Sequence, residues 1–198
     1  MGHQAFRHRW RLTAREDEGI NYAPGELTFY SSSELDHTNL SPATKKFLIE
    51  GGLPKETVHG CIDFNAKIAS STIESLKDQI LLEGDHFNHY YIIGNVENGW
   101  ICINSDAKDQ VVVVDTDYPD LVESGKNASS RHYQGEFFMN SSVVQLAECL
   151  LTYQEFWHEH KEMNEALQEE LQEKMRAIDP ACMEENTFWW YGDSNDSI

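Results

Sequence analysis

Residues 89–115, HYYIIGNVENGWICINSDAKDQVVVVD, contain three apolar runs rich in β-branched residues, and two short polar segments separate them. Asn98-Gly99 is a strong signal for a tight hairpin turn between the first two runs. Because a parallel crossover needs about a dozen residues or more, strands joined this closely must be antiparallel. The third run lacks polar alternation, which predicts a central strand with both faces covered. The predicted strands cover residues 89–96, 99–104 and 110–115.

A short helix is predicted upstream of this meander, and it ends abruptly. Ser41 is a suitable N-cap and Pro42 a suitable first residue, so the helix would run to about Glu50. One of the two glycines at 51–52 can adopt the left-handed conformation that ends a helix. Pro54 has no N–H and cannot continue it. We expect this stop to direct the following segment back toward a sheet.

The N-terminal segment allows two interpretations. Residues 6–12, FRHRWRL, alternate apolar or aromatic residues with arginine, which predicts a strand with the arginines on one face. Phe6, Trp10 and Ala14 are also spaced as on one side of a helix, so a helical interpretation stays open.

Further strands are expected over residues 27–30, 58–64 and 131–140, and residues 66–83 fit either a helix or irregular structure. A helix capped by Asn140 or Ser141 is expected to begin near Ser142. Its apolar residues keep three- and four-residue steps as far as Ile178, and its outer face is rich in glutamate. The periodicity does not decide whether this helix is continuous or broken near residues 159–161.

The chain has 198 residues and a formal net charge of -19. Its length favours one domain over residues 26–190, with an N-terminal extension over 1–25 and a polar tail over 191–198. The negative charge disfavours direct binding of nucleic acid and suits a basic protein partner, or serves solubility alone. The sequence shows no secretory signal and no apolar run of the ~20 residues that a membrane span needs. We therefore expect a cytoplasmic protein with no membrane partner.

No sequence motif for a catalytic nucleophile, a nucleotide or a zinc site is present. The four cysteines lie far apart, and Cys102 and Cys149 fall within apolar runs, where burial makes a thiol inert. His158 and His160 are two residues apart on a predicted helix, so they face different directions and make a poor metal-binding pair. We expect no enzymatic activity, no metal site and no cofactor.

An acidic loop follows the third meander strand. Four carboxylates gather there with no base between them, and Tyr118 and Pro119 lie among them. Carboxylates around an exposed aromatic residue suit an interface with Lys and Arg on a partner. A solvated loop without a partner is the alternative, and Trp100 is interpreted as a core residue. The candidate partner-binding residues are Asp115, Asp117, Tyr118, Asp120 and Glu123.

Five short motifs occur in a characteristic order along the chain: TKKFLIEGGLPKE, YYIIGNVENGWICINS, QVVVVD, FFMNSSVVQLAECLLTY and IDPACMEENTFWW. In order and spacing they resemble the SUKH superfamily, and in particular its fourth branch of bacterial immunity proteins. The resemblance extends from about Leu27 to Trp190. Each motif is short and degenerate, so the order and the spacing carry the resemblance.

The resemblance implies an α+β fold, in which helices pack on a twisted, mainly antiparallel β-sheet. It also implies an immunity protein that binds and neutralises a cognate secreted toxin, typically a nuclease or another toxin directed at nucleic acids. It transfers no catalytic residue. Two other functions are compatible with the sequence: a regulatory or scaffold module of the same superfamily, and a small-molecule-binding α+β domain.

Overall fold

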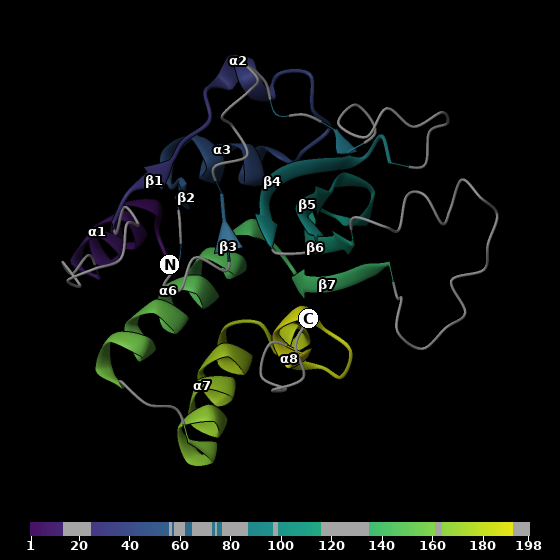
Figure 1. Cartoon of the computed structure of the whole chain (residues 1–198). Coiled ribbons are helices and arrows are strands. Elements are labelled where there is room, and N and C mark those ends of the chain that lie inside the picture. The colour runs from purple at the N-terminus through teal and green to yellow at the C-terminus, as the bar shows by residue number, and fades with distance from the viewer. Residues whose placement is uncertain are drawn as a thin grey trace.

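The computed structural model describes residues 1–13, 25–55, 57, 62–64, 73, 75–76, 87–96, 99–115, 135–160 and 164–191, apart from the side chains of Trp190 and Tyr191. Helices and antiparallel sheets combine in an α+β fold, as predicted (Figure 1). None of the described helices is both long enough and apolar enough to cross a membrane.

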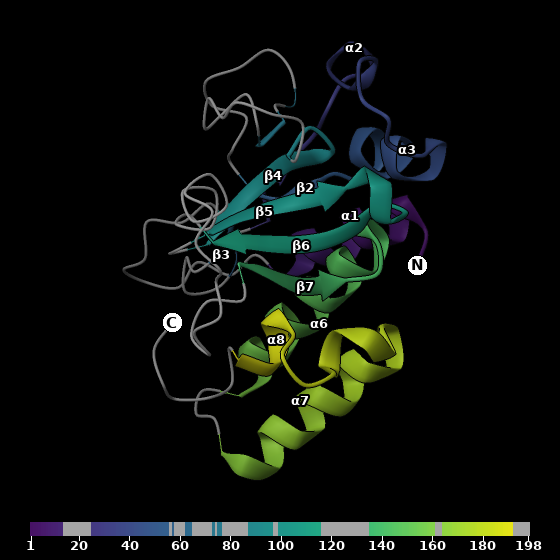
Figure 2. The same cartoon turned by 90° about the vertical axis from the view of Figure 1, so that its right-hand side faces the viewer.

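A five-stranded antiparallel sheet forms the centre of the fold, with the strand order β3-β4-β5-β6-β7 (Figure 2). The predicted meander is confirmed as β4, β5 and β6, and β6 is an interior strand whose four valines are all buried. A two-residue connection brings Val96 opposite Gly99, although residues 97–98 themselves lie outside the described part. The strands are β3 (Ile62–Asp63), β4 (Tyr90–Val96), β5 (Gly99–Asn104), β6 (Gln110–Asp115) and β7 (Glu136–Asn140).

The short strand β3 comes close to β4 at a glycine. The pairing of β4 with β5 shifts between Ile92 and Gly94, which marks a bulge. A Cβ atom on Gly94 would lie 2.6 Å from the carbonyl oxygen of Asp63. Only glycine therefore allows β3 to approach β4 this closely.

The abrupt helix is present as α3 (Pro42–Glu50), with the predicted cap and the predicted end. The hydroxyl of Ser41 accepts a hydrogen bond from the backbone N–H of Thr44 over 3.3 Å. The N–H groups of both following glycines donate to the carbonyl of Phe47. Gly52 has a φ of 74°, the left-handed conformation that ends the helix.

The stop of α3 leads directly into a small second sheet. Strand β2 (Leu53–Pro54) pairs antiparallel with β1 (Leu27–Thr28), so the segment does turn back to a sheet. β1 is shorter than the predicted strand over residues 27–30. The short helix α2 (Ser32–Leu35) lies between β1 and α3.

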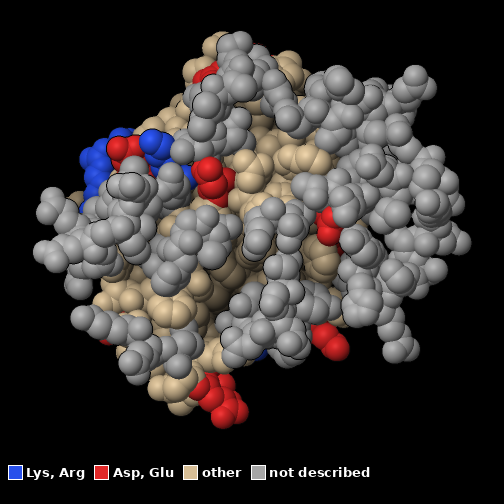
Figure 3. Space-filling model, in the orientation of Figure 1, with Lys and Arg blue, Asp and Glu red and all other residues tan. Residues whose placement is uncertain are grey.

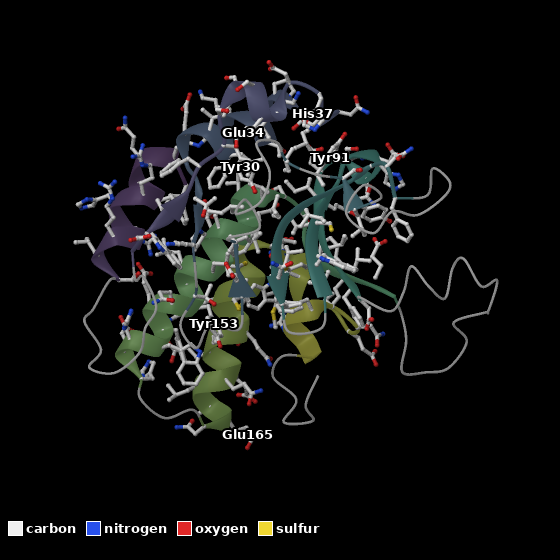
Figure 4. The ribbon with its side chains drawn as sticks, turned by 45° about the horizontal axis from the view of Figure 1, so that its top comes forward. Tyr30, Glu34, His37, Tyr91, Tyr153 and Glu165 are labelled. Carbon is white, nitrogen blue, oxygen red and sulfur yellow. The ribbon has the colours of Figure 1, made fainter. Side chains whose placement is uncertain are left out.

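The segment around α2 is attached to the central sheet through Tyr91 (Figure 4). The backbone N–H of Asn39 donates to the Tyr91 hydroxyl over 3.2 Å. The ring of His37 meets the Tyr91 ring edge-on, with 6.5 Å between centroids. These contacts hold the α2 region against β4.

The prediction of a strand over residues 6–12 is wrong, because the segment forms helix α1 (His3–Leu12). A strand would place Phe6, His8 and Trp10 on one face. In the structure Phe6 and Trp10 are both buried, whereas His8 is exposed. Burial at four-residue spacing selects the helical alternative.

The long C-terminal helix is broken into α6 (Val143–Glu159) and α7 (Glu165–Ile178). Ser142 caps α6 by accepting from the N–H of Gln145 over 3.3 Å. The predicted caps, Asn140 and Ser141, are therefore wrong. Asn140 still belongs to β7, and the amide of its side chain donates to Asp179 instead.

The C-terminal segment returns to the sheet edge through η4 (Pro180–Met183) and α8 (Phe188–Tyr191), which both contact β7. Asp179 is 1% exposed, and its hydrogen bonds attach this segment to the end of β7. Its carboxylate accepts from the Asn140 amide over 3.1 Å, from the Ser141 N–H over 2.7 Å and from the Ser141 hydroxyl over 2.8 Å. The indole N–H of Trp189 donates to Asn140 over 3.1 Å, so β7, α6 and α8 meet at one buried network.

Two apolar clusters cover the two faces of the sheet. The larger cluster joins one face to helices α1, α3, α6 and α7. The smaller cluster lies on the opposite face, where Leu76 and Phe87 pack on the strands. Its strand residues are Tyr90, Ile92, Cys102, Val112 and Val114, with Trp100 partly buried against them.

Candidate protein-binding surface

The structure places one of the five predicted contact residues. Asp115 is the last residue of β6, and its backbone N–H donates to the carbonyl of Gly135 over 3.0 Å. Its side chain is half-buried. Asp117, Tyr118, Asp120 and Glu123 lie outside the described residues, so their role as contacts stays a prediction.

The charged residues of the central sheet gather at the end from which this loop departs. The five strands contain no Lys or Arg, and their only carboxylates are Asp63, Asp115 and Glu136. All three lie in the last two rows of cross-strand pairs, while the remaining rows are mainly apolar. We call this region the acidic sheet end and define it as Asp63, Asn95, Trp100, Asp115 and Glu136.

One row of pairs crosses all five strands at the acidic sheet end. Asp63 pairs with Asn95, Asn95 with Trp100, Trp100 with Val114, and Val114 with Glu136. Directly paired residues project from the same face of a sheet. Trp100 and Val114 belong to the smaller apolar cluster, so the whole row faces that side. Asp115 pairs with Gly99 in the adjacent row and projects from the opposite face.

Glu136 is held in position by a tyrosine. The hydroxyl of Tyr90 donates to its Oε2 atom over 2.5 Å. The Tyr90 ring is fixed in turn by His89, with 4.4 Å between centroids, and by Phe87, with 5.7 Å. This carboxylate is therefore oriented before any partner arrives.

The Lys and Arg residues that the structure describes lie elsewhere on the surface. In Figure 3, the Lys and Arg side chains in view gather mainly at the left, where α1 and β1 lie in Figure 1. On α1, Arg9 Nε donates to Glu155 Oε1 over 3.1 Å, and Arg7 lies over the Phe29 ring at 5.0 Å. Arg7 and Arg9 of α1 thus contact the body of the protein itself.

A second acidic surface covers the outer side of α7, as the sequence predicted. Glu165, Glu169, Glu170 and Glu173 are exposed there. The hydrogen bond and charge of Lys174 lower the pKa of Glu170. Lys174 and Arg176 on the same helix partly offset the charge of these acids, whereas the strands of the acidic sheet end carry no base.

The described thiols are buried, as expected. Cys102, Cys149 and Cys182 are free and inaccessible, and Cys61 lies outside the described residues. Burial, followed by the charge of Glu136, raises the pKa of the Cys102 thiol. The pKa of Cys149 is raised chiefly by its hydrogen bond with Cys182 and by burial. Such thiols stay protonated and are poor nucleophiles.

The histidines singled out by the sequence have structural neighbours. The Nε2 atom of His158 lies 3.1 Å from the side-chain nitrogen of Gln154. The ring of His160 packs on Phe156, with 4.5 Å between centroids. Across the described part of the chain, no group of three or more His, Cys, Asp or Glu side chains is placed to hold a metal ion.

Sequence reasoning missed Asp63, Glu136 and the exposed part of Trp100. Trp100 was predicted to be core, and it does pack on the smaller cluster, but it is only half-buried. The predicted strand ends at Val96 and Gly99 held part of the signal, because a two-residue connection between them places Asn95 opposite Trp100. The positions of Asp63 and Glu136 depend on the registers of β3 and β7, which no turn signal sets.

A scan against protein-family models matched the chain to the SUKH-4 immunity protein family over residues 19–196. Searches of curated proteins and of solved structures gave no match. The family match spans nearly the whole chain and includes every strand of the central sheet. The match agrees with the fold, in which the predicted meander is present as β4, β5 and β6 and the predicted short helix as α3. The chain therefore belongs to the SUKH-4 immunity protein family.

Proposed function

We propose that this chain neutralises a cognate toxin by binding it stoichiometrically, without transforming a substrate. Membership of the family assigns the chain an immunity role and implies a toxin protein as its partner. The acidic sheet end is the observation that carries the finer proposal, because it offers carboxylates and an indole without any base in the strands. Its chemistry suits recognition of a basic protein surface.

The proposed contact surface joins the acidic sheet end to the loop over residues 115–123. A toxin directed at nucleic acids needs a basic groove to grip phosphates. An acidic inhibitor that covers this groove blocks the substrate and associates quickly through long-range attraction. We propose a nuclease or another nucleic-acid-directed toxin as the partner, and the cytoplasm as the place of binding. The chain itself, with a net charge of -19, is not expected to bind nucleic acid.

The loop can be tested by removing two charges. In the Asp117→Ala/Asp120→Ala variant, we expect association with the purified cognate toxin to slow about tenfold at low salt. The dependence of the rate on salt should weaken as well. The matched control is Glu169→Ala/Glu173→Ala on α7, which removes the same charge from a different surface. Stopped-flow measurements in which both variants associate like the wild type would remove the loop from the interface.

A further inference from the structure

We propose that Cys149 and Cys182 are a site of disulfide formation. The pair forms a bond when the chain folds in the presence of a low-molecular-weight disulfide, and burial then preserves whichever redox form was made during folding. This modification site is independent of the proposed toxin binding. Three observations support it: the contact between the two thiols, their complete burial, and the position of Cys102 on the other side of the sheet.

The two thiols meet although they are far apart in the sequence. Cys149 lies in α6, and Cys182 lies in η4, beyond α7. A hydrogen bond joins their side chains. The Nδ2 atom of Asn140 donates to Cys149 Sγ over 3.4 Å, and the backbone N–H of Cys182 donates to the carbonyl of Asp179 over 3.1 Å. The fold therefore holds the two sulfurs side by side, which is the first requirement for a disulfide.

The third described cysteine cannot compete for either partner. Cys102 belongs to the smaller apolar cluster, whereas Cys149 and Cys182 both belong to the larger one. These clusters lie on opposite faces of the central sheet, so its backbone separates Cys102 from the pair. Among the cysteines that the structure describes, only Cys149 and Cys182 are placed to form a bond with each other.

Burial determines when the bond can form. Thiol–disulfide exchange requires a thiolate that can reach the other reagent. Both cysteines are 0% exposed, and the hydrogen bond with Cys182, together with burial, raises the pKa of Cys149. The folded dithiol thus offers neither a thiolate nor access, and the same burial shields a completed bond from reducing thiols. The redox form is therefore set while the chain folds, when both thiols are exposed and have a pKa near the usual value of about 8.5.

Glutathione disulfide can serve as the oxidant. The thiolate of one cysteine attacks a sulfur of glutathione disulfide, which gives a mixed disulfide and releases one glutathione thiolate. The thiolate of the other cysteine attacks the protein sulfur of that mixed disulfide, forms the bond between Cys149 and Cys182, and releases the second glutathione thiolate. Two electrons pass from the cysteines to glutathione, and the released thiolates take up the two protons. Where glutathione is mainly reduced, the chain folds as the dithiol.

The test compares refolding with incubation of the native protein. The full chain is refolded from urea with glutathione disulfide, and the native reduced chain is kept in the same oxidant for the same time. After the remaining thiols are alkylated, trypsin cuts after Lys161 and Arg176, so Cys149 and Cys182 fall on different peptides. We expect mass spectrometry without reduction to find these peptides joined in most of the refolded chain and separate in the native chain.

Variants and stability test the same bond independently. Cys149→Ala and Cys182→Ala should each abolish the bond, and Cys102→Ala, the matched control, should retain it. Because the bond closes a loop that contains α7, it restricts the unfolded chain, and the urea midpoint should rise by about 1–2 M. Reduction of the unfolded chain should return the midpoint to that of the dithiol. If an alanine variant does not fold, the peptide map of the wild type decides the pairing by itself.

Each outcome has a defined meaning. A refolded chain in which the pair stays reduced, carries glutathione, or is bonded to Cys61 or Cys102 would overturn the site. Cross-linking of the native chain as fast as that of the refolding chain would overturn the inference that burial preserves the redox form. Joined peptides after refolding, separate peptides in the native chain, and loss of the bond in both alanine variants support the proposal.

Discussion

The substitution Trp10→Ala examines whether α1 is an integral part of the fold. The family match begins at residue 19, after the end of α1 at Leu12. Trp10 is nevertheless 1% exposed and belongs to the larger apolar cluster, together with residues of α3 and α6. We expect the substitution to destabilise the whole domain, because it opens a cavity in the common core.

The structure sets the expected magnitude. A buried tryptophan removes about 150–250 Å² from water, and its replacement by alanine costs about 3–5 kcal/mol. The surface ion pair between Arg9 and Glu155 contributes only about 0–1 kcal/mol, so burial decides how strongly α1 is attached. Within the described part of the chain, the Trp10 indole nitrogen has no hydrogen-bond partner, so no hydrogen bond is lost. We expect a loss of about 4 kcal/mol.

Urea unfolding followed by far-UV circular dichroism measures this loss without depending on tryptophan fluorescence. Leu12→Ala is the control, since Leu12 is 67% exposed and its removal should change the free energy of unfolding by less than about 0.5 kcal/mol. Trp10→Phe should cost much less than alanine, because it keeps a ring and removes the unpaired N–H. A Trp10→Ala variant within about 1 kcal/mol of the wild type would refute the reasoning, because it would leave α1 energetically separate.

Three further predictions follow from buried groups. Asp179→Ala should lower the free energy of unfolding by about 3 kcal/mol or more in urea titrations, because it leaves the Asn140 amide and the Ser141 N–H without their acceptor. A loss below about 1 kcal/mol would show that water replaces the carboxylate. Burial, followed by the charge of Glu34, raises the pKa of Tyr30 above the unfolded value of about 10. The stability from this tyrosine is complete below that pH and is lost above it, as the unfolded chain releases its proton first. Unfolding at a series of alkaline pH values should therefore show a shallower decline for Tyr30→Phe than for the wild type, and parallel declines would contradict it. Cys102 and Cys149 should react with a disulfide reagent such as DTNB at mildly alkaline pH only after unfolding in urea, and equally fast reaction in the native protein would show that they are accessible.

The local signals in the sequence predicted the elements whose ends are set by adjacent residues. Ser41 and Gly52 delimit α3, and the pairing of β4 with β5 follows from the short connection predicted between Val96 and Gly99. Such features depend on backbone chemistry within a few residues, so one segment is enough to identify them. The sequence resemblance also indicated the family that the scan later matched.

Features that depend on tertiary contacts could not be predicted in this way. FRHRWRL has strand and helix periodicity together, and packing of Phe6 and Trp10 on the core decides between them. The shift of the α6 cap to Ser142 arises because Asn140 serves β7 and the network of Asp179. Of the residues at the acidic sheet end, only Asp115 was named from the sequence. The positions of Asp63 and Glu136 depend on the pairing of β3 with β4 and of β6 with β7, and each pair joins segments that are far apart in the sequence.

The central claim is that this chain acts by occupying a toxin rather than by turning over a substrate. Titration of the activity of the purified cognate toxin with increasing amounts of the chain tests it most directly. The account predicts a linear loss of activity that is complete at one molecule of chain per molecule of toxin. Complete inactivation at far lower ratios, or undiminished activity in molar excess of the chain, would contradict it.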